Sequence, residues 1–254
     1  MAGVGAAELD LIILATSTPD DLFGSASKVQ SLIGASKAVA FDLTAACSGF
    51  VFGLVVASQF IRTGVYENVL LIGADILSRW VDWSDRNTCV LFGDGAGAVV
   101  CQAAELGDRL LGFELCSDGR QNSCLNLAYA GQAKLLVEGI SVGLGTYQPI
   151  TMNGREVYRF AVAKVPEVIE KALFRANLPV EQIDWLILHQ ANQRIMDAVA
   201  ERLNLAKEKV ISNLAEQGNT SAASIPLALD RAVREGKIQS GDIIATSGFG
   251  AGLT

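Results

Sequence analysis

Three residues far apart in the sequence carry side chains suited to acyl-transfer chemistry. Cys47 lies in the segment AACSGF, between an apolar run typical of a strand and one typical of a helix. His189, the chain's single histidine, follows the apolar run WLIL, and Asn219 lies in the segment GNTS. A thiol, an imidazole and an amide together resemble a cysteine, histidine and asparagine constellation, in which the thiol is the nucleophile.

Cys47 has two interpretations on local sequence. At the first turn of a helix, the backbone N–H groups and the helix dipole favour an anion, which predicts a thiol that ionises more easily than usual. The same N–H groups are suited to holding an oxyanion. The alternative is a small buried hydrophobe, because cysteine is among the most buried residue types. We give that second interpretation to the remaining cysteines, Cys89, Cys101, Cys116 and Cys124.

The other candidates also have a structural alternative. His189 follows a buried strand, at the end where sites in open α/β sheets collect, but a hydrogen-bonded polar cap is equally typical there. Asn219 is suited to capping the next helix. Gly250 and Ala251, in the segment GFGAG, offer backbone N–H groups to an oxyanion or form a tight turn. The segment GDGAG at 93–97 lacks dinucleotide-loop spacing, and we expect a hairpin turn there.

The elements that must position these residues occur twice along the chain. Each copy contains a buried strand, a second strand, a junction, a helix closed by an RTG or REG stop, and a further strand. The matching segments are 8–14 with 182–188, 39–43 with 210–214, 50–62 with 224–234, and 68–73 with 242–247. Strand–helix–strand order predicts right-handed crossovers in a mostly parallel sheet. We therefore expect Cys47 and Asn219 at equivalent strand-to-helix junctions that face one shared site.

The predicted domain organisation follows from this repeat. We expect a first half over residues 1–105, a connecting and site-covering segment over 106–150, and a second half over 151–254. The stretch 106–145, rich in Gly, Ser and Asn, predicts loops over a binding site. Residues 88–101 predict two strands around the glycine-rich turn, and 157–175 predict a helix from their apolar spacing.

Composition narrows the class of protein. With 50% hydrophobic and 19% charged residues among 254, the chain predicts a globular protein, and its longest apolar stretch is too short to span a bilayer. A net charge of -7 argues against nucleic-acid binding. The 5 cysteines lack CxxC spacing and indicate neither a disulfide framework nor a zinc site. The N-terminus does not resemble a signal peptide, so we expect the cytoplasm, or the plastid stroma if the source is a plant or an alga.

Five segments together resemble a known family. They are FDLTAACSGF, FGDGAGAVV, ILHQANQRI, GNTSAASIP and GFGAGL, and they occur in order across essentially the whole chain. The family is β-ketoacyl-[acyl-carrier-protein] synthase III, the initiating condensing enzyme of type II fatty-acid synthesis. The segments STPDDLFGS and RWVDWSDRNTC resemble its cyanobacterial and plastid branch. The resemblance implies the thiolase fold, a layered αβαβα sandwich built from two similar halves, and a homodimer.

The resemblance also implies a reaction. Cys47 takes an acyl group, most simply acetyl, from a CoA thioester. His189 and Asn219 then promote decarboxylation of malonyl-[acyl-carrier protein] by donating hydrogen bonds to the enolate oxygen. The elongating condensing enzymes use two histidines, and this chain has one. No permanently bound cofactor or metal is implied, since the CoA thioester is a substrate.

Further implied roles rest on single matched positions. Leu22 and Phe23 match a loop that reaches into the partner's acyl pocket, and Arg194 matches a residue implicated in docking the acidic carrier protein. The positions that match the lining of the CoA channel are Arg86, Gly154, Tyr158, Ala191 and Asn192. Four basic residues either extend the docking patch or form an ordinary solvated face, namely Lys164, Arg202, Lys207 and Lys209.

Departures from the family pattern leave alternatives open. Relatives carry a strand–helix segment before the position of Ala2 and a final strand after Thr254, so we expect a sequence truncated at both ends, as a fragment or a natural short form. One alternative function is another CoA-dependent condensing enzyme, of the polyketide-starter or hydroxymethylglutaryl-CoA type. Another is a catalytically incompetent fragment that retains dimerisation or carrier-protein binding.

Overall fold

The first half of the chain forms a four-stranded sheet. The computed structural model describes residues 3–103 and 109–254. The strands are β1 (Leu11–Ala15), β2 (Val39–Leu43), β3 (Asn68–Ile76) and β4 (Asp94–Gln102), in the order β2-β1-β3-β4. β1 is parallel to β2 and β3, whereas β4 runs antiparallel to β3. Every residue of β1 is buried, as expected for a parallel strand covered on both faces.

The second half repeats this arrangement in a shorter form. β9 (Trp185–Leu188) and β10 (Ile244–Ser247) are parallel, and Val210 forms a parallel bridge to β9. The order Val210, β9, β10 therefore matches β2, β1, β3. The helices after the two junctions, α2 (Gly49–Arg62) and α6 (Ser224–Arg234), also correspond. The predicted glycine stops are confirmed, because Gly64 and Gly236 have left-handed φ angles of 71° and 72°.

One predicted strand is wrong. We expected 210–214 to pair along β9, but only its first residue does so, and Leu214–Gln217 form the helix α5. The reason is Gln190, whose buried side chain takes the place of further strand pairing. Its Nε2 donates to the carbonyl oxygen of Ile211, and its Oε1 accepts from the amide of Asn213.

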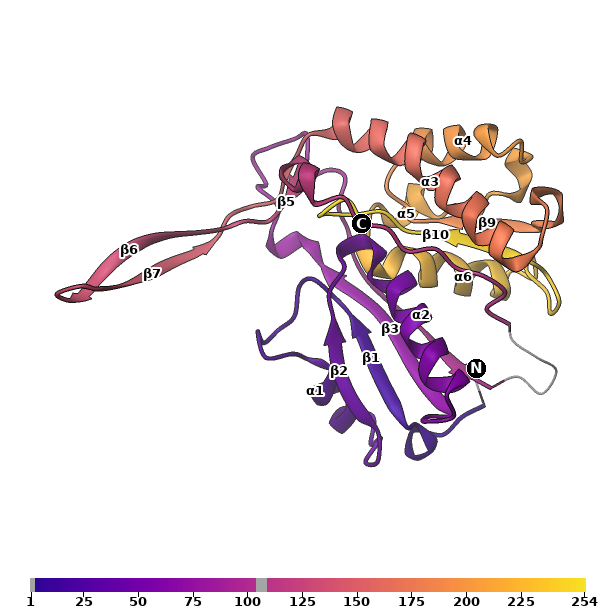
Figure 1. The fold of residues 1–254 in the computed structure, drawn as a ribbon, viewed down its shortest axis with the longest axis horizontal. Helices are drawn as coiled ribbons and strands as arrows, with labels where there is room; N and C mark the ends of the chain where they lie inside the picture. Colours follow the sequence, from indigo (N-terminus) through magenta and orange to yellow (C-terminus); the bar gives the residue numbers. More distant parts are fainter. Residues whose placement is uncertain (1–2, 104–108) are drawn as a thin grey trace.

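The elements stack in five layers (Figure 1). α1 (Ala26–Leu32) packs on the first sheet, α2 and α6 lie between the two sheets, and α3 (Gly154–Ala176) and α4 (Gln193–Arg202) cover the second. One buried apolar cluster joins α3 and α4 to β9, and another joins α2 and α6 to β1 and β3. The fold is therefore the αβαβα sandwich of two similar halves that the resemblance implies.

Helical segments account for most of the remaining connections. The helix predicted over 157–175 is confirmed as α3, which Asn153 caps by accepting the amide of Glu156. Short 3₁₀ turns are η1 (Ala6–Glu8), η2 (Ala46–Ser48), η3 (Leu77–Arg79), η4 (Gly119–Cys124), η5 (Val180–Gln182), η6 (Lys207–Lys209) and η7 (Ser221–Ala223). Within the described ranges, none of the helices is both long and apolar enough to cross a bilayer.

The glycine-rich segment at 93–97 is not the predicted hairpin turn. Most of it belongs to β4, which is one continuous strand. A Cβ on Gly95 would lie 2.9 Å from Cδ1 of Leu227, and a Cβ on Gly97 would lie 3.0 Å from the backbone nitrogen of the same residue. Alternate residues of a strand share one face, so these glycines let α6 approach the sheet closely.

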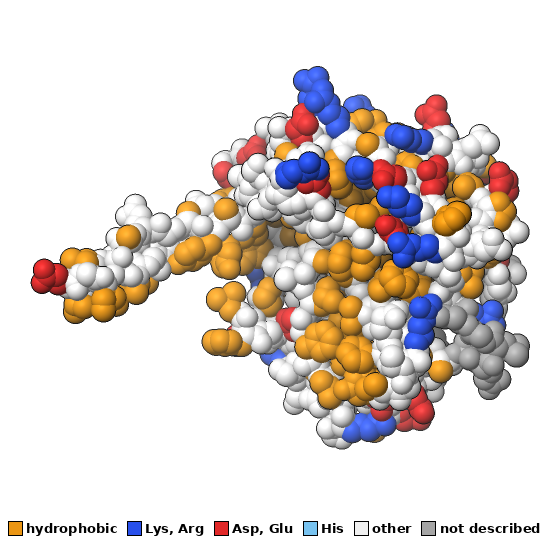
Figure 2. Space-filling model, in the orientation of Figure 1, with side chains coloured by type: hydrophobic (Ala, Val, Ile, Leu, Met, Phe, Trp, Pro, Cys, Tyr) orange, Lys and Arg blue, Asp and Glu red, His pale blue; other side chains and the backbone are white. Residues whose placement is uncertain are grey.

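The segment between the halves also differs from the prediction. It is not made of loops alone, because β6 (Tyr129–Val137) and β7 (Ile140–Tyr147) form an antiparallel hairpin that projects from the body, at left in Figure 1. Residues on either side of the hairpin, such as Leu127 and Ile150, line the cavity in front of Cys47, so the predicted covering role stays a prediction. At its base, β5 (Leu125–Asn126) pairs with β8 (Thr151–Met152). Hydrophobic side chains remain exposed along this arm (Figure 2). The predicted boundary between 105 and 106 lies outside the described residues, and the division at 150 stays a prediction.

Gly73 lies where the two halves approach each other closely, so a side chain at this position would clash with the second half. This β3 residue faces the turn η7, and a Cβ on it would overlap the carbonyl oxygen of Ala222. We expect Gly73→Ala to lower the free energy of unfolding by about 1–3 kcal/mol, because the backbone must move. Chemical denaturation measures this change.

The matched control is Gly143→Ala in β7, where an added Cβ meets no atom within 4 Å. We expect this control to change the free energy of unfolding by less than about 0.5 kcal/mol. Equal losses in the two variants contradict the packing argument.

Candidate active site

Two short turns meet at the centre of the molecule. Cys47 is the middle residue of η2, between β2 and α2, and Ala222 is the middle residue of η7, before α6. Each turn begins with a non-glycine residue in the left-handed region, Ala46 at φ 47° and Ser221 at φ 50°. Cys47 therefore corresponds to Ala222. Asn219 shares the predicted junction but precedes the second turn, so the two residues are not at equivalent positions.

The Cys47 thiol is buried, with 7% of its surface exposed. Burial raises its pKa to about 12, and the negative charge of Asp75 adds to this effect, while a hydrogen bond from the Ser221 side chain opposes it. The thiol is therefore neutral at pH 7 in the unliganded protein. The prediction of an easily ionised thiol is wrong for this state, because desolvation outweighs the favourable end of α2.

His189 lies directly after β9 and is almost completely enclosed, with 1% of its surface exposed. Its Nδ1 lies 2.7 Å from Oγ of Ser224, and its ring packs edge-on against Phe249 with 5.3 Å between centroids. Burial lowers the pKa of this imidazole to about 3, so the ring is neutral at pH 7. Its Nε2 has no hydrogen-bond partner in the described part of the chain.

Asn219 is held from both sides by backbone groups. Its amide donates to the carbonyl oxygen of Leu91 at 2.9 Å, and its carbonyl oxygen accepts from Gly93 at 2.9 Å. Its side-chain Oδ1 accepts from the amide of Ser221 at 2.9 Å. That bond orients the side chain so that Nδ2 carries the two free donors, and no described residue accepts from them.

Shared neighbours bring the three residues together. Ser221 contacts both the thiol of Cys47 and Oδ1 of Asn219. The segment after β10 reaches the other two, because Phe249 packs on the ring of His189 and a Cβ on Gly250 would lie 2.7 Å from the backbone nitrogen of Cys47. The three side chains come from different elements of both halves and are linked through these shared neighbours. Of the three, Cys47 lines the cavity described below, whereas His189 and Asn219 are not among its lining residues.

The two amides predicted after the last strand to hold an oxyanion, those of Gly250 and Ala251, differ in their hydrogen bonding. The amide of Gly250 donates to the carbonyl oxygen of Thr254 at 3.1 Å, so the prediction that this amide holds an oxyanion is wrong here. The amides of Ala251 and Cys47 donate to no backbone oxygen within the described ranges. Both residues line the same cavity, which leaves their N–H groups as the candidate pair.

A cavity of about 1430 Å³ opens in front of Cys47. Leu22 and Phe23, both strongly exposed, stand on its wall. Its other apolar lining residues include Phe41, Leu77, Trp80, Phe92 and Ile150. The apolar part of the lining is therefore suited to an acyl chain.

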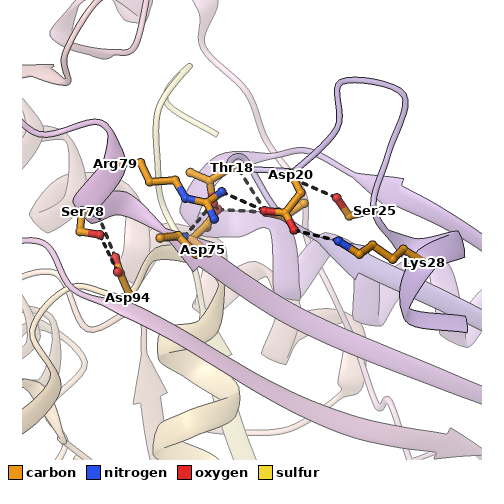
Figure 3. A network of polar contacts seen from close by, with 10 residues as sticks. Thr18, Asp20, Ser25, Lys28, Asp75, Ser78, Arg79 and Asp94 are labelled. Carbon is orange, nitrogen blue, oxygen red and sulfur yellow. Dashed lines mark hydrogen bonds and ion pairs between the residues drawn. The ribbon is translucent and has the colours of Figure 1, made fainter. Parts of the chain in front are cut away.

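Asp75, which sequence reasoning missed, is a buried acidic residue that accepts hydrogen bonds from both halves. Figure 3 shows its contact with Thr18 of the first half. Its Oδ1 accepts from the amide of Ser17 at 2.8 Å and from the hydroxyl of Thr18 at 3.0 Å. Its Oδ2 accepts from the amide of Ala222, in the turn η7, at 3.2 Å. At the cavity rim, Arg79 pairs with Asp20. A single carboxylate in the apolar strand NVLLIGADI is the signal that could have identified Asp75.

The residues predicted to line a CoA channel are not brought into this cavity. Gly154 begins α3, and Asn192 caps α4 by accepting the amide of Arg194. The five positions absent from the lining of the Cys47 cavity are Arg86, Gly154, Tyr158, Ala191 and Asn192. Their binding role stays a prediction.

Arg194 is exposed on the first turn of α4. Three of the other basic residues already have partners, which favours an ordinary surface role for them. Lys164 pairs with Glu167, Arg202 donates to a carbonyl oxygen in α3, and Lys209 donates to the carbonyl oxygen of Ile183.

This chain is similar to known proteins in both sequence and structure. Two family models match it, 3-oxoacyl-[acyl-carrier-protein] synthase III over residues 41–119 and the C-terminal part of that enzyme over 173–254. β-Ketoacyl-[acyl-carrier-protein] synthase III of Microcystis aeruginosa is 75% identical over 254 residues, covering 100% of this chain and 76% of its own. The enzyme of that name from a Nostoc species is 75% identical over 253 residues, with the same two shares.

A solved structure is also similar over almost the whole chain. The 3-oxoacyl-[acyl-carrier-protein] synthase III of Aquifex aeolicus superposes with a TM-score of 0.89 at 44% identity. The match covers 99% of this chain and 77% of that one.

The raised pKa of Cys47 predicts how its alkylation depends on pH. Because the thiol is protonated below a pKa of about 12, its rate of reaction with iodoacetamide should rise about tenfold per pH unit between pH 7 and 9. Peptide mass spectrometry measures the rate at Cys47. Cys116 in the same sample is the control for reagent, because it is exposed, which contradicts the buried position predicted for it. A rate at Cys47 that levels off below pH 9 contradicts the prediction.

Proposed function

This chain belongs to the β-ketoacyl-[acyl-carrier-protein] synthase III family, and we propose that Cys47, His189 and Asn219 carry out its reaction. The protein is an acyltransferase, the initiating condensing enzyme of type II fatty-acid synthesis. The reaction joins an acyl-CoA, which we propose to be acetyl-CoA, to malonyl-[acyl-carrier protein]. The products are a 3-oxoacyl-[acyl-carrier protein], CoA and carbon dioxide.

The first step transfers the acyl group to Cys47. The sulfur attacks the thioester carbonyl carbon as the S–H proton leaves, and the amides of Cys47 and Ala251 stabilise the oxyanion. The carbon–sulfur bond to CoA then breaks, and the departing CoA sulfur takes up one proton. The cavity beside the thiol holds the acyl chain, and the product at Cys47 is again a thioester, so the acyl group stays activated.

The second step generates the carbon nucleophile. The bond between the malonyl carboxylate and its α-carbon breaks, carbon dioxide leaves, and the electron pair moves into a thioester enolate. Two unused donors support this step, Nε2 of His189 and Nδ2 of Asn219, since both side chains are held by other bonds at their opposite ends. A neutral imidazole with Nε2 protonated is a donor to the enolate oxygen.

The third step forms the new carbon–carbon bond. The enolate carbon attacks the acyl carbonyl on Cys47, and the tetrahedral intermediate expels the Cys47 sulfur, which takes up a proton. This regenerates the neutral thiol that burial favours. The observation that supports the proposal is the set of shared neighbours, Ser221 and the segment 249–250, that links one buried thiol to two side chains with unused hydrogen-bond donors.

Several partner roles complete the proposal. Arg194, exposed at the start of α4, is suited to docking the acidic carrier protein. The family resemblance supports Arg86, Gly154, Tyr158, Ala191 and Asn192 as CoA contacts. It also supports a homodimer in which Leu22 and Phe23 reach the partner. We propose that the enzyme works without a resident cofactor, in the cytoplasm or in the stroma of a plastid.

The acylation step predicts a covalent adduct. Incubation with acetyl-CoA alone should leave one acetyl group on Cys47, because no carbon nucleophile is present to remove it. Intact-protein and peptide mass spectrometry locate the adduct. Cys47→Ser should give no thioester, whereas Cys116→Ser, at an exposed cysteine, should be acetylated on Cys47 like the parent protein. Absence of the adduct from the parent protein contradicts the proposed nucleophile.

The decarboxylation step predicts a specific loss at Asn219. Asn219→Ala should slow release of carbon dioxide from malonyl-[acyl-carrier protein] about 10²–10³-fold, as for loss of one oxyanion donor. Acetylation of Cys47 should persist. The matched control is Asn213→Ala, which also truncates a buried asparagine of the second half but leaves both proposed donors in place. If both variants lose decarboxylation equally, the effect is one of folding and the donor role fails.

A further inference from the structure

Ser224 is a buried serine in direct contact with the single histidine. It is the first residue of α6, with 1% of its surface exposed, and its Oγ lies 2.7 Å from Nδ1 of His189. Oγ also lies 3.3 Å from the amide nitrogen of Gln190. The side chain therefore touches His189 and the residue that follows it. We propose that Ser224 is a positioning residue that fixes the tautomer of His189.

The hydrogen bonds around Ser224 determine where its hydroxyl hydrogen points. A serine hydroxyl has one hydrogen to donate and two lone pairs that accept. The amide of Gln190 is always a donor, so it occupies one lone pair of Ser224. The ring nitrogen Nδ1 is the one acceptor within hydrogen-bond distance of this hydroxyl among the described residues. The hydroxyl hydrogen therefore points to Nδ1, which must be unprotonated.

The opposite tautomer of His189 would leave one hydrogen-bonding group of Ser224 without a partner. If Nδ1 carried the hydrogen, it would donate to Ser224, and the hydroxyl hydrogen would then have no acceptor. An unmade hydrogen bond is costly in a site from which water is excluded. The neutral ring consequently holds its hydrogen on Nε2. The helix α6 thus determines which nitrogen of His189 is a donor.

This assignment deepens the proposed function and rests on it for its catalytic meaning. An enolate oxygen needs a donor, and only a ring protonated at Nε2 presents one on the side away from Ser224. The backbone amide of His189, which donates to Ser247, orients the residue but does not select a tautomer. Ser224 supplies that selection without touching the substrate.

The tautomer is directly measurable because the chain has one histidine. Nitrogen-15 labelling of histidine gives one pair of ring signals in a long-range proton–nitrogen spectrum. At pH 7 we expect the unmodified 254-residue chain to show Nε2 protonated and Nδ1 unprotonated. Nδ1 protonation in this spectrum overturns the proposal, whatever the enzyme's activity.

Variants connect the tautomer to the reaction. Ser224→Ala should shift the ring signals toward a tautomer mixture and slow malonyl decarboxylation at least about tenfold, while Cys47 acetylation continues. Ser224→Thr, which keeps the hydroxyl, should restore both the spectrum and the rate. Ser212→Ala, at an exposed serine bonded to Gln193, is the control and should change neither. An unchanged ring spectrum in folded Ser224→Ala overturns the proposal.

Different results would contradict the donor role of His189 and the positioning role of Ser224. If His189→Ala decarboxylates as fast as the parent protein, the proposed donor role of His189 is wrong. The measured tautomer still tests Ser224 in that case. If His189→Ala is inactive but Ser224→Ala keeps both the parent spectrum and the parent rate, the donor role survives and the positioning role is overturned.

Discussion

The contact between η2 and η7 is the constraint on which the site depends. Ala46 and Ser221 adopt left-handed backbone conformations that cost about 1–3 kcal/mol each, so both turns require support from their surroundings. Gly73 leaves room for the carbonyl group of Ala222, and Asp75 binds the amide of the same residue. The position of Cys47, the proposed nucleophile, is therefore set by packing between the two halves, more than by the local helix end.

Packing between the halves also buries the side chains of Cys47 and His189. The same burial that holds Cys47 and His189 in place keeps both neutral at pH 7. Charge therefore develops only when substrate binds and reacts, and fixed N–H groups meet it. In a region of low dielectric, such preorganised donors are worth more than in water. A neutral His189 fits this scheme, because it donates a hydrogen without introducing a buried positive charge.

The sequence predicts what depends on local pattern. Buried strands, glycine stops and the duplication are all visible in residue periodicity, and the structure confirms them. Long-range contacts are invisible at that level. The partners Asp75 and Ala222 are separated by 147 residues, and His189 and Ser224 by 35. Such contacts decide that the glycines before Ala98 form a strand that packs against α6, and that the Cys47 thiol is neutral.

The two halves carry different side chains at corresponding positions of the turns η2 and η7, as expected after duplication and divergence. Ala46 corresponds to Ser221, so Cys47 corresponds to Ala222 and Thr44 to Asn219. Condensation joins an acyl carbon to an enolate carbon, and each carbonyl oxygen needs its own donors. In the proposed mechanism, Cys47 in the first turn holds the acyl group on sulfur, while Asn219, just before the second turn, donates to the enolate. A thiol at 222 would compete for acyl groups, whereas alanine leaves only its backbone amide, which Asp75 occupies.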